Sequence, residues 1–488
     1  MNLLRRRLSW KFLLLLVFVA ALIPVAIIGW GSLYRDFLEP NVPQILISDI
    51  PRGIGLAPVS LRVSLSDSDS GLDEVIVRTR QKGRSRELER RQLFGSRSVM
   101  FSIEFPGDKS DLEEGDAEVV IKAFDRSFWS NTAEKVIALK VDYRKPRVEV
   151  LTAQHNAVKG GSQLVLYKAF DESLAVSGVK VGNQTFLGFP ARGLDNSIED
   201  PSIYAAIYAV GFNQQVDESA VRVFAEDYVG NVVSMSFRNR IQSRVARDIS
   251  RRLSEEWLRE KISTLADINF KKFQEIAQRD GRGGVYESQR GGSERLLEQF
   301  KWVNENLRGL NQNEISGFLE RSRFERLWEG PFLRLPGSVL GAYGERVNFD
   351  FQGQAAGSWL RLGYEFGSTR DSPDVESAAA GIVVLADDLG VYGRTVIVDH
   401  GLGLSTLYGG LSSTAVMRGE TITQGQKIGE GGTSGISFSP RVYFEMRVQN
   451  VPVDAREWWD QRWYYGHILA KINETKRALG LPVYQPLQ

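Results

Sequence analysis

The residue types that most often bind metal ions or perform acid–base catalysis are scarce in this 488-residue chain. It contains no cysteine and three histidines, His155, His400 and His467. The lack of cysteine excludes disulfides and thiolate metal sites, and it fits either redox compartment. His400 follows Asp399, but no G-x-S-x-G sequence supplies a serine nucleophile for a triad. We therefore expect a structural role for His400, and we assign no role to the other two histidines.

Three short segments near the C-terminus carry a pattern that points to a known family. They are Arg361-Leu362-Gly363-Tyr364-Glu365, Tyr408-Gly409-Gly410-Leu411 and Arg441-Val442-Tyr443. The pattern resembles the lysostaphin/LytM-type zinc peptidases, which cut the peptide cross-links of bacterial cell walls. That family carries H-x-G-x-D, Y-A-H-L and H-x-H at the matching positions. The resemblance extends to about Trp463 and covers about a quarter of the chain.

The resemblance implies where a zinc site would lie and what has replaced it. Its ligands would fall at Arg361, Glu365 and Tyr443, its general base at Arg441 and a stabilising histidine at Gly410. A catalytic zinc needs about three donor atoms with free lone pairs and one open position. Arginine stays protonated and has no lone pair to give. We therefore predict a degenerate, non-catalytic member without zinc, in which these five positions form a binding pocket or groove.

The N-terminus has the pattern of a membrane anchor. Arg5, Arg6, Arg7 and Lys11 precede an uncharged apolar run over residues 12–30, which is long enough to cross a bilayer as a helix. The basic cluster predicts a cytoplasmic N-terminus and an extracytoplasmic, periplasmic remainder. The alternative is a cleaved signal peptide, which is disfavoured because the apolar run is long and no clean cleavage site follows. We expect a single-pass protein of the bacterial cytoplasmic membrane.

The composition and the hydrophobic patterns predict a mainly β chain with a helical linker region. Short alternating runs separated by glycine, aspartate and asparagine turns predict two immunoglobulin-like sandwiches. A weak repeat supports them, since Asp125 with Asn131 recurs as Asp227 with Asn231. With 61 basic and 60 acidic residues the chain has no bias toward nucleic acid. The predicted parts are an anchor (1–35), two sandwiches (43–143 and 144–241), a helical region (242–329), a peptidase-like antiparallel sheet domain (330–463) and a C-terminal helix and tail (464–488).

The helical region shows apolar residues at helical spacing. Ile249, Leu253 and Trp257 recur every fourth residue, and Ser293 is a candidate N-cap after a glycine-rich break. A second helix should place Leu296, Phe300, Val303 and Leu307 on one face. These helices either pack on their neighbours in the ordinary way or form an arm that covers or presents the groove. Further on, strands are expected at Gly381–Ala386, Arg394–His400, Leu404–Tyr408 and Arg441–Val448.

Three functions are consistent with this pattern. The first is a non-catalytic envelope protein that acts in peptidoglycan remodelling by binding a partner or a wall peptide. Degenerate members of the family activate cell-wall amidases, so the resemblance makes an amidase a candidate partner. The second is a working zinc endopeptidase with a rebuilt site, and the third is a structural envelope spacer. In the vacated pocket we expect Glu365 to bridge Arg361 and Arg441, because two guanidinium groups in one pocket repel each other unless an anion lies between them. The alternative is that these side chains point to solvent and line a peptide-binding groove.

Overall fold

The computed structural model describes residues 39–107, 111–269, 271, 275, 292–367 and 372–485, together with residues 17–18, 23–24 and 29. The predicted anchor at residues 12–30 therefore lies almost entirely outside the described residues. Within the described ranges, no helix is both long and apolar enough to cross a membrane.

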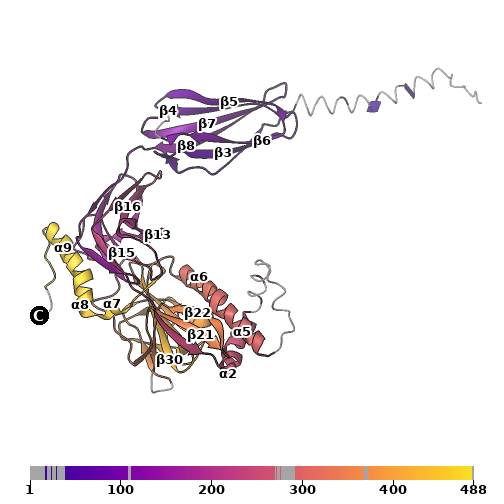
Figure 1. Cartoon of the computed structure of the whole chain (residues 1–488). Coiled ribbons are helices and arrows are strands. Elements are labelled where there is room, and N and C mark those ends of the chain that lie inside the picture. The colour runs from indigo at the N-terminus through magenta and orange to yellow at the C-terminus, as the bar shows by residue number, and fades with distance from the viewer. Residues whose placement is uncertain are drawn as a thin grey trace, which may run out of the picture. The chain divides into compact units, whose positions relative to one another are not determined.

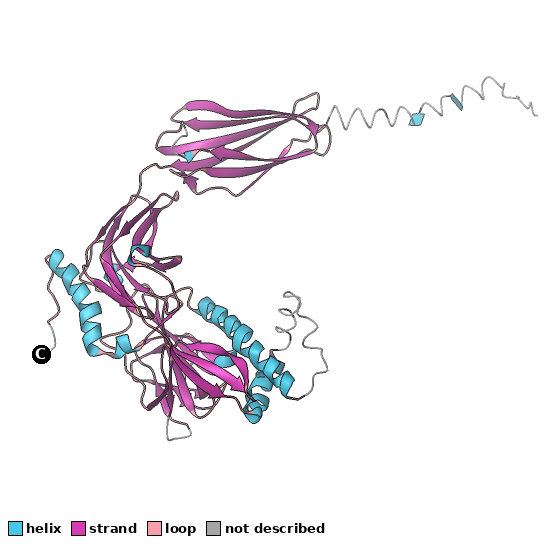
Figure 2. Ribbon diagram, in the orientation of Figure 1, coloured by secondary structure: helices cyan, strands magenta, loops and turns pink. Residues whose placement is uncertain are grey.

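The described chain consists mainly of β-strands, as predicted, and has fewer helices than strands (Figure 2). It divides into two compact units, which are residues 1–145 with 226–232, and residues 146–225 with 233–488.

The first unit is built from two β-sheets that enclose one core. The first sheet contains β1 (Gln44–Ser48), β3 (Val59–Ser66) and β6 (Ser98–Phe105). The second contains β2 (Gly53–Ile54), β8 (Thr132–Val141), β7 (Gly115–Asp125), β4 (Leu72–Gln81) and β5 (Arg84–Ser96). Alternate residues of β3 (Leu61, Val63 and Leu65) are buried, as the two-residue period of a strand requires. The immunoglobulin-like topology stays a prediction.

The repeated Asp and Asn residues close loops in the same way in both places. The Asp125 carboxylate accepts a hydrogen bond from the Asn131 backbone N–H at 2.8 Å. The Asp227 carboxylate accepts the equivalent bond from Asn231, also at 2.8 Å. The repeat therefore marks a recurring turn in which a buried carboxylate satisfies backbone donors.

The second unit begins with another pair of sheets. One contains β14 (Phe189–Pro190), β15 (Ile203–Ala209), β11 (Ser162–Phe170) and β9 (Arg147–Val150). The other contains β13 (Gln184–Leu187), β12 (Leu174–Val181), β16 (Val221–Asp227) and β17 (Val232–Ser236). A parallel pair, β10 (His155–Val158) with β18 (Asn239–Gln242), lies beside them. Short 3₁₀ turns occupy η2 (Ala191–Gly193) and η3 (Glu218–Ala220).

The C-terminal part is a large antiparallel sheet. Its main order is β20-β23-β30-β27-β26-β25-β28. The bounds are β20 Ser338–Gly341, β23 Tyr364–Gly367, β24 Asp374–Glu376, β25 Gly381–Asp388, η6 Gly390–Tyr392, β26 Arg394–Gly401, β27 Leu404–Thr414, β28 Thr421–Ile422, β29 Lys427–Gly431, β30 Arg441–Val448 and β31 Val451–Val453. The four strands predicted from the sequence are all present. The strands β25, β26 and β27 are longer than predicted, and β30 has the predicted bounds.

A separate three-stranded sheet, ordered β19-β21-β22, corrects one prediction. It contains β19 (Arg247–Arg252), β21 (Glu345–Phe351) and β22 (Gln354–Arg361), and β19 pairs with β21 in parallel. The prediction that Ile249 begins a helix is wrong, because Ile249 pairs with Val347 across this sheet. The four-residue spacing from Ile249 to Leu253 is a local signal for a helix, but pairing with a strand about 100 residues away places Ile249 in a sheet instead.

The helices begin after β19. They are α2 (Glu255–Trp257), the π-helical turn η4 (Leu258–Ser263), α3 (Thr264–Ile268), α5 (Ser293–Trp302), the π-helical turn η5 (Val303–Leu307) and α6 (Arg308–Phe318). Leu296, Phe300, Val303 and Leu307 are all buried, as predicted. Ser293 is not the N-cap, since the helix begins at Ser293 itself and Gly292 occupies the cap position. The chain ends with α7 (Arg456–Trp459), α8 (Gln461–Tyr464), the π-helical turn η7 (Tyr465–Leu469) and α9 (Ala470–Ala478).

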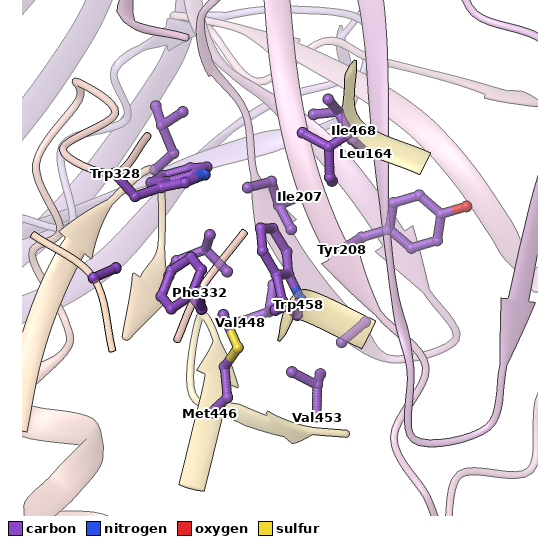
Figure 3. Close-up of a cluster of buried hydrophobic side chains, with 14 of the residues drawn as sticks. Leu164, Ile207, Tyr208, Trp328, Phe332, Met446, Val448, Val453, Trp458 and Ile468 are labelled. Atoms are coloured by element: carbon purple, nitrogen blue, oxygen red, sulfur yellow. The ribbon is translucent and has the colours of Figure 1, made fainter. Parts of the chain in front are cut away.

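One hydrophobic core joins the second sandwich to the C-terminal sheet. Leu164 and Ile207 of the sandwich lie in the same cluster as Trp328 and Trp458 (Figure 3). The Trp458 indole N–H donates to Ser162 Oγ at 2.9 Å. The Ser162 backbone N–H donates to the Glu457 carboxyl at 2.7 Å. These polar contacts across the core hold α7 against β11.

We predict that Glu457→Gln stabilises the fold more at high pH than at low pH. Burial raises the pKa of Glu457 from 4.5 to about 8, so the folded chain retains a proton that the unfolded chain releases. The contribution of this carboxyl to stability is therefore complete below about pH 4.5 and is lost as the pH rises through about 8. The glutamine variant should unfold at a higher temperature than the parent at about pH 9 and near the same temperature at about pH 4.5.

Calorimetry of both chains across this pH range measures the difference. His155 and His400 titrate in both chains and cancel in the comparison. Glu376→Gln, at an exposed position, is the matched control. A pH-independent difference between parent and Glu457→Gln would contradict the prediction.

Candidate functional site

The structure brings the five predicted pocket residues together. Arg361 ends β22, Glu365 lies in β23, Gly410 in β27, and Arg441 and Tyr443 in β30. Glu365 pairs with Tyr443 across neighbouring strands. All five residues line a single pocket.

The charged residues of the pocket form the predicted bridge. Glu365 Oε2 lies 2.5 Å from Arg441 Nη1, and Glu365 Oε1 lies 3.5 Å from Arg361 Nη2. Arg361 also forms an ion pair with Glu345, which precedes it in the neighbouring strand β21. The two arginines are 6% and 5% exposed, so solvent screens these charges only weakly. The prediction that Glu365 lies between Arg361 and Arg441 is confirmed.

Tyr443 is engaged elsewhere. Its hydroxyl donates to Glu445 Oε2 at 2.6 Å, and Arg447 Nε donates to the other oxygen of Glu445 at 2.5 Å. Burial raises the pKa of Tyr443 well above its usual range, so the phenol stays protonated. A protonated phenol already bound to a carboxylate is a poor metal ligand.

The backbone conformation at position 410 requires glycine. Its φ of +76° is readily adopted only by glycine. A Cβ atom there would lie 3.0 Å from Ser437 Oγ and 3.2 Å from the Arg441 carbonyl oxygen. The position predicted for a stabilising histidine therefore has neither the side chain nor the backbone conformation for one.

The donor set does not fit zinc. At the three ligand positions the chain offers a guanidinium group, a carboxylate held between two guanidinium groups, and a protonated phenol. Only Glu365 has an oxygen available for a cation, and two positive groups within 3.5 Å already neutralise it. A divalent cation placed here would be repelled by Arg361 and Arg441.

His400 lies outside this pocket and is fully buried. Its Nδ1 lies 2.7 Å from the Ala380 carbonyl oxygen and its Nε2 lies 2.7 Å from Thr406 Oγ1. Burial lowers the pKa of His400 to about 4, so the ring is neutral at physiological pH. These contacts are those of a structural histidine within the sheet. His155 is likewise buried, and its ring nitrogens contact Thr152 and the Arg238 carbonyl oxygen.

Helices cover the pocket on one side. Trp257 stacks on Phe438 with ring centroids 4.2 Å apart, and Phe300 of α5 meets Phe349 of β21 edge to face. The Asn304 side chain donates to the Ser358 carbonyl at 3.1 Å. Figure 1 shows α5 and α6 running beside β21 and β22. These contacts agree with ordinary packing of the helices on their neighbours, and the arm that covers or presents the groove stays a prediction.

Sequence reasoning missed three charged residues of the site. Glu345 pairs with Arg361, while Arg251 of β19 and Arg308 of α6 line the pocket. The alternation of Arg247, Ile249 and Arg251 is a strand signal that could have placed Arg251. No local pattern identifies Arg308, because its position follows from how α6 packs on the sheet.

The antiparallel sheet and the positions of its motif residues define a peptidase-type domain. Residues 361–455 match Peptidase family M23. The chain therefore carries an M23 domain at its C-terminus.

Three relatives share this region. The murein hydrolase activator EnvC of Escherichia coli is 35% identical over 127 residues, or 26% of this chain and 28% of the relative. The DD-carboxypeptidase/endopeptidase Mpg of Neisseria meningitidis is 30% identical over 95 residues, or 20% of this chain and 22% of the relative. Stage II sporulation protein Q of Bacillus subtilis is 36% identical over 90 residues, or 18% of this chain and 32% of the relative. The chain spans less than a third of the length of each of these relatives.

We predict that Glu365→Gln strongly destabilises the domain. Removing the carboxylate leaves two buried guanidinium groups facing each other, and breaking a buried charge pair costs about 3 kcal/mol or more. Denaturant unfolding of parent and variant measures the loss in unfolding free energy.

The double variant Glu365→Gln with Arg441→Met is the control. It removes Arg441, which loses its carboxylate partner in the single variant, whereas Arg361 keeps its ion pair with Glu345. The loss should therefore be smaller than that of the single variant. A loss below about 1 kcal/mol for Glu365→Gln, as a solvent-screened pair would give, would show that the cluster does not stabilise the domain.

Proposed function

We propose that this chain is a non-catalytic M23 protein of the bacterial envelope that acts in peptidoglycan remodelling by binding a protein partner. The observation that carries the proposal is the ion cluster of Arg361, Glu365 and Arg441 at the predicted metal position. The family fold is retained there, while the groups that would hold and activate a zinc-bound water are replaced. A domain that has the sheet and the pocket of the family, but not its zinc-binding groups, is suited to binding a partner and not to catalysis.

A murein hydrolase is the first candidate for the partner. The support comes from the relative whose name describes it as a murein hydrolase activator. The predicted class, from the resemblance seen in the sequence, is a cell-wall amidase. Direct binding of a wall peptide is the other possibility, and the helices over the pocket disfavour it because an extended peptide needs an open groove.

The proposed location is the extracytoplasmic face of the cytoplasmic membrane. The apolar run at residues 12–30 would anchor the chain, and the basic residues before it set the orientation. In this arrangement the M23 domain and its partner share the compartment that contains peptidoglycan.

The catalytic alternative is tested by metal content. We expect the purified full chain to contain no stoichiometric zinc by elemental analysis and to release no peptides from peptidoglycan. The variant Arg361→His with Tyr443→His restores the ligand types of the family around Glu365, and it serves as the positive control for zinc uptake. One equivalent of zinc in the parent, with cleavage lost on Glu365→Ala, would overturn the non-catalytic assignment.

The binding proposal is tested by reconstitution. The full chain should capture a murein hydrolase from an envelope extract, and the purified hydrolase should release dye-labelled peptidoglycan several-fold faster with the chain than without it. If no hydrolase is captured or stimulated, the structural spacer becomes the better assignment.

The orientation is tested by reporter fusions. A C-terminal alkaline phosphatase should be active and a C-terminal cytoplasmic reporter inactive, because the basic residues keep the N-terminus inside. Recovery of a chain that begins near residue 30 would replace the anchor with a cleaved signal peptide.

A further inference from the structure

The pocket at the predicted metal position carries excess positive charge. The guanidinium groups of Arg251, Arg308, Arg361 and Arg441 line it, while Glu365 is the one carboxylate among the lining residues. Glu345 does not line the pocket, but its carboxylate forms an ion pair with Arg361 and so offsets one of these positive charges. Two positive charges remain in excess after both carboxylates are counted.

Three of these guanidinium groups have unused capacity to bind an anion. Arg361 is 6% exposed, yet its Nε–H is buried without an acceptor. Among the described residues, neither Arg251 nor Arg308 has a carboxylate within ion-pair distance. In the described part of the chain, the Arg308 guanidinium donates to the Asn304 side-chain oxygen, at 3.1 Å from its Nε. Burial lowers the pKa of Arg308 to about 10, which reflects the cost of its charge in this surrounding.

Aromatic rings hold these two arginines in place. The Arg308 guanidinium lies 4.0 Å from the ring centroid of Trp359, and that of Arg251 lies 3.9 Å from Phe438. Such stacking orients the guanidinium plane and leaves its edge available for hydrogen bonds. The remaining walls are apolar and include Phe300 and Val347. The pocket therefore combines a cationic end with an apolar lining.

The free space is small. The cavity is about 60 Å³, whereas sites that enclose drug-sized ligands are roughly 300–1,000 Å³. At roughly 10–15 Å³ for each water-sized group, a cavity of about 60 Å³ accepts about four to six heavy atoms. This is about the size of a carboxylate with two to four carbons.

We infer that the pocket is a receptor for one carboxylate, supplied by an acidic side chain of the protein partner. The carboxylate would pair with the guanidinium groups left without an anion, and its methylene groups would contact the aromatic walls. This inference rests on the proposed function and names the chemistry by which the partner is recognised. Arginine pairs with carboxylates through parallel, charge-assisted hydrogen bonds, so the site selects both charge and shape.

A side chain fits this site better than a linear wall peptide. The cavity takes a single short group, and α5 and η5 contact β21 and β22 beside it, which narrows the space for an extended peptide. A side chain projecting from a folded partner meets both constraints. The wall peptide, which also carries carboxylates, becomes an outcome of the test.

The test uses the full chain and sodium propionate as the probe, at constant ionic strength. Isothermal titration should show saturable binding of propionate, weaker binding of acetate because it buries less apolar surface, and none of propan-1-ol. Arg308→Met and Arg251→Met should each weaken propionate at least tenfold. Arg346→Met is the matched control, since Arg346 is exposed and next to Val347 on the opposite face of β21. That variant should bind within twofold of the parent.

The source of the carboxylate is tested with three peptides, of which the two tripeptides are capped at both ends. A tripeptide with a central glutamate should bind, its glutamine analogue should not, and a wall stem peptide with a free C-terminal carboxylate should bind at least tenfold more weakly than the glutamate peptide. Tighter binding of the stem peptide would overturn the assignment to a protein partner. Tighter binding of inorganic phosphate than of propionate would overturn the carboxylate class.

Folding of the variants is checked by their unfolding temperature. Arg308→Met removes a half-buried cation that has no carboxylate within ion-pair distance among the described residues, so the ligand-free variant should unfold at the same or a higher temperature than the parent. Loss of propionate binding with the fold intact supports the inference, and undiminished binding in both variants overturns it. Partner capture that persists in Arg308→Met and Arg251→Met would overturn the carboxylate receptor while leaving the proposed function in place.

Discussion

Two buried guanidinium groups held apart by one carboxylate are the constraint on which the C-terminal domain depends. Glu365 contacts both Arg361 and Arg441, so three strands meet through their charges where a metal ion would join them in a peptidase. These groups are side chains of the protein itself, whereas a metal ion can dissociate. Gly341 makes room for the arrangement, because a Cβ atom there would lie 2.4 Å from Arg361 Cζ. The net stabilisation is modest, since desolvation of the ions offsets much of their attraction.

The same surroundings connect the helices to the sheet. Gln312 of α6 donates to the Tyr392 hydroxyl at 2.5 Å and accepts a hydrogen bond from Arg447, which also binds Glu445. Glu445 in turn accepts from the Tyr443 hydroxyl. A continuous polar network therefore runs from Tyr443, which lines the pocket, to Gln312 of α6. Buried networks of this kind favour a single arrangement of their members, because each unsatisfied group would be costly.

The parts of the fold that were predictable from sequence are those with local signals. The strands at Arg394–Gly401 and Arg441–Val448 follow from β-rich runs between glycine turns, and the buried face of α5 and η5 follows from helical spacing. The bridge by Glu365 followed from charge alone once the family resemblance placed three residues in one pocket. Arg308 and Glu345 were not predictable, because they reach the site through contacts between distant segments. For Ile249, the local spacing pointed to a helix, and a distant strand determined the outcome.

The pairing of β19 with β21 has a practical consequence for anyone dividing this chain into pieces. The region that matches the family begins at Arg361, and the change in sequence character suggests a boundary near residue 330. A fragment cut near residue 330 loses β19 and leaves one edge of β21 unpaired. A fragment that begins at Arg361 loses β19, β21 and all of β22 except Arg361, and so lacks this sheet altogether. Exposed strand edges recruit other chains and lead to aggregation. A soluble fragment should therefore begin before Arg247, and insolubility of a shorter one would reflect the cut and not the domain.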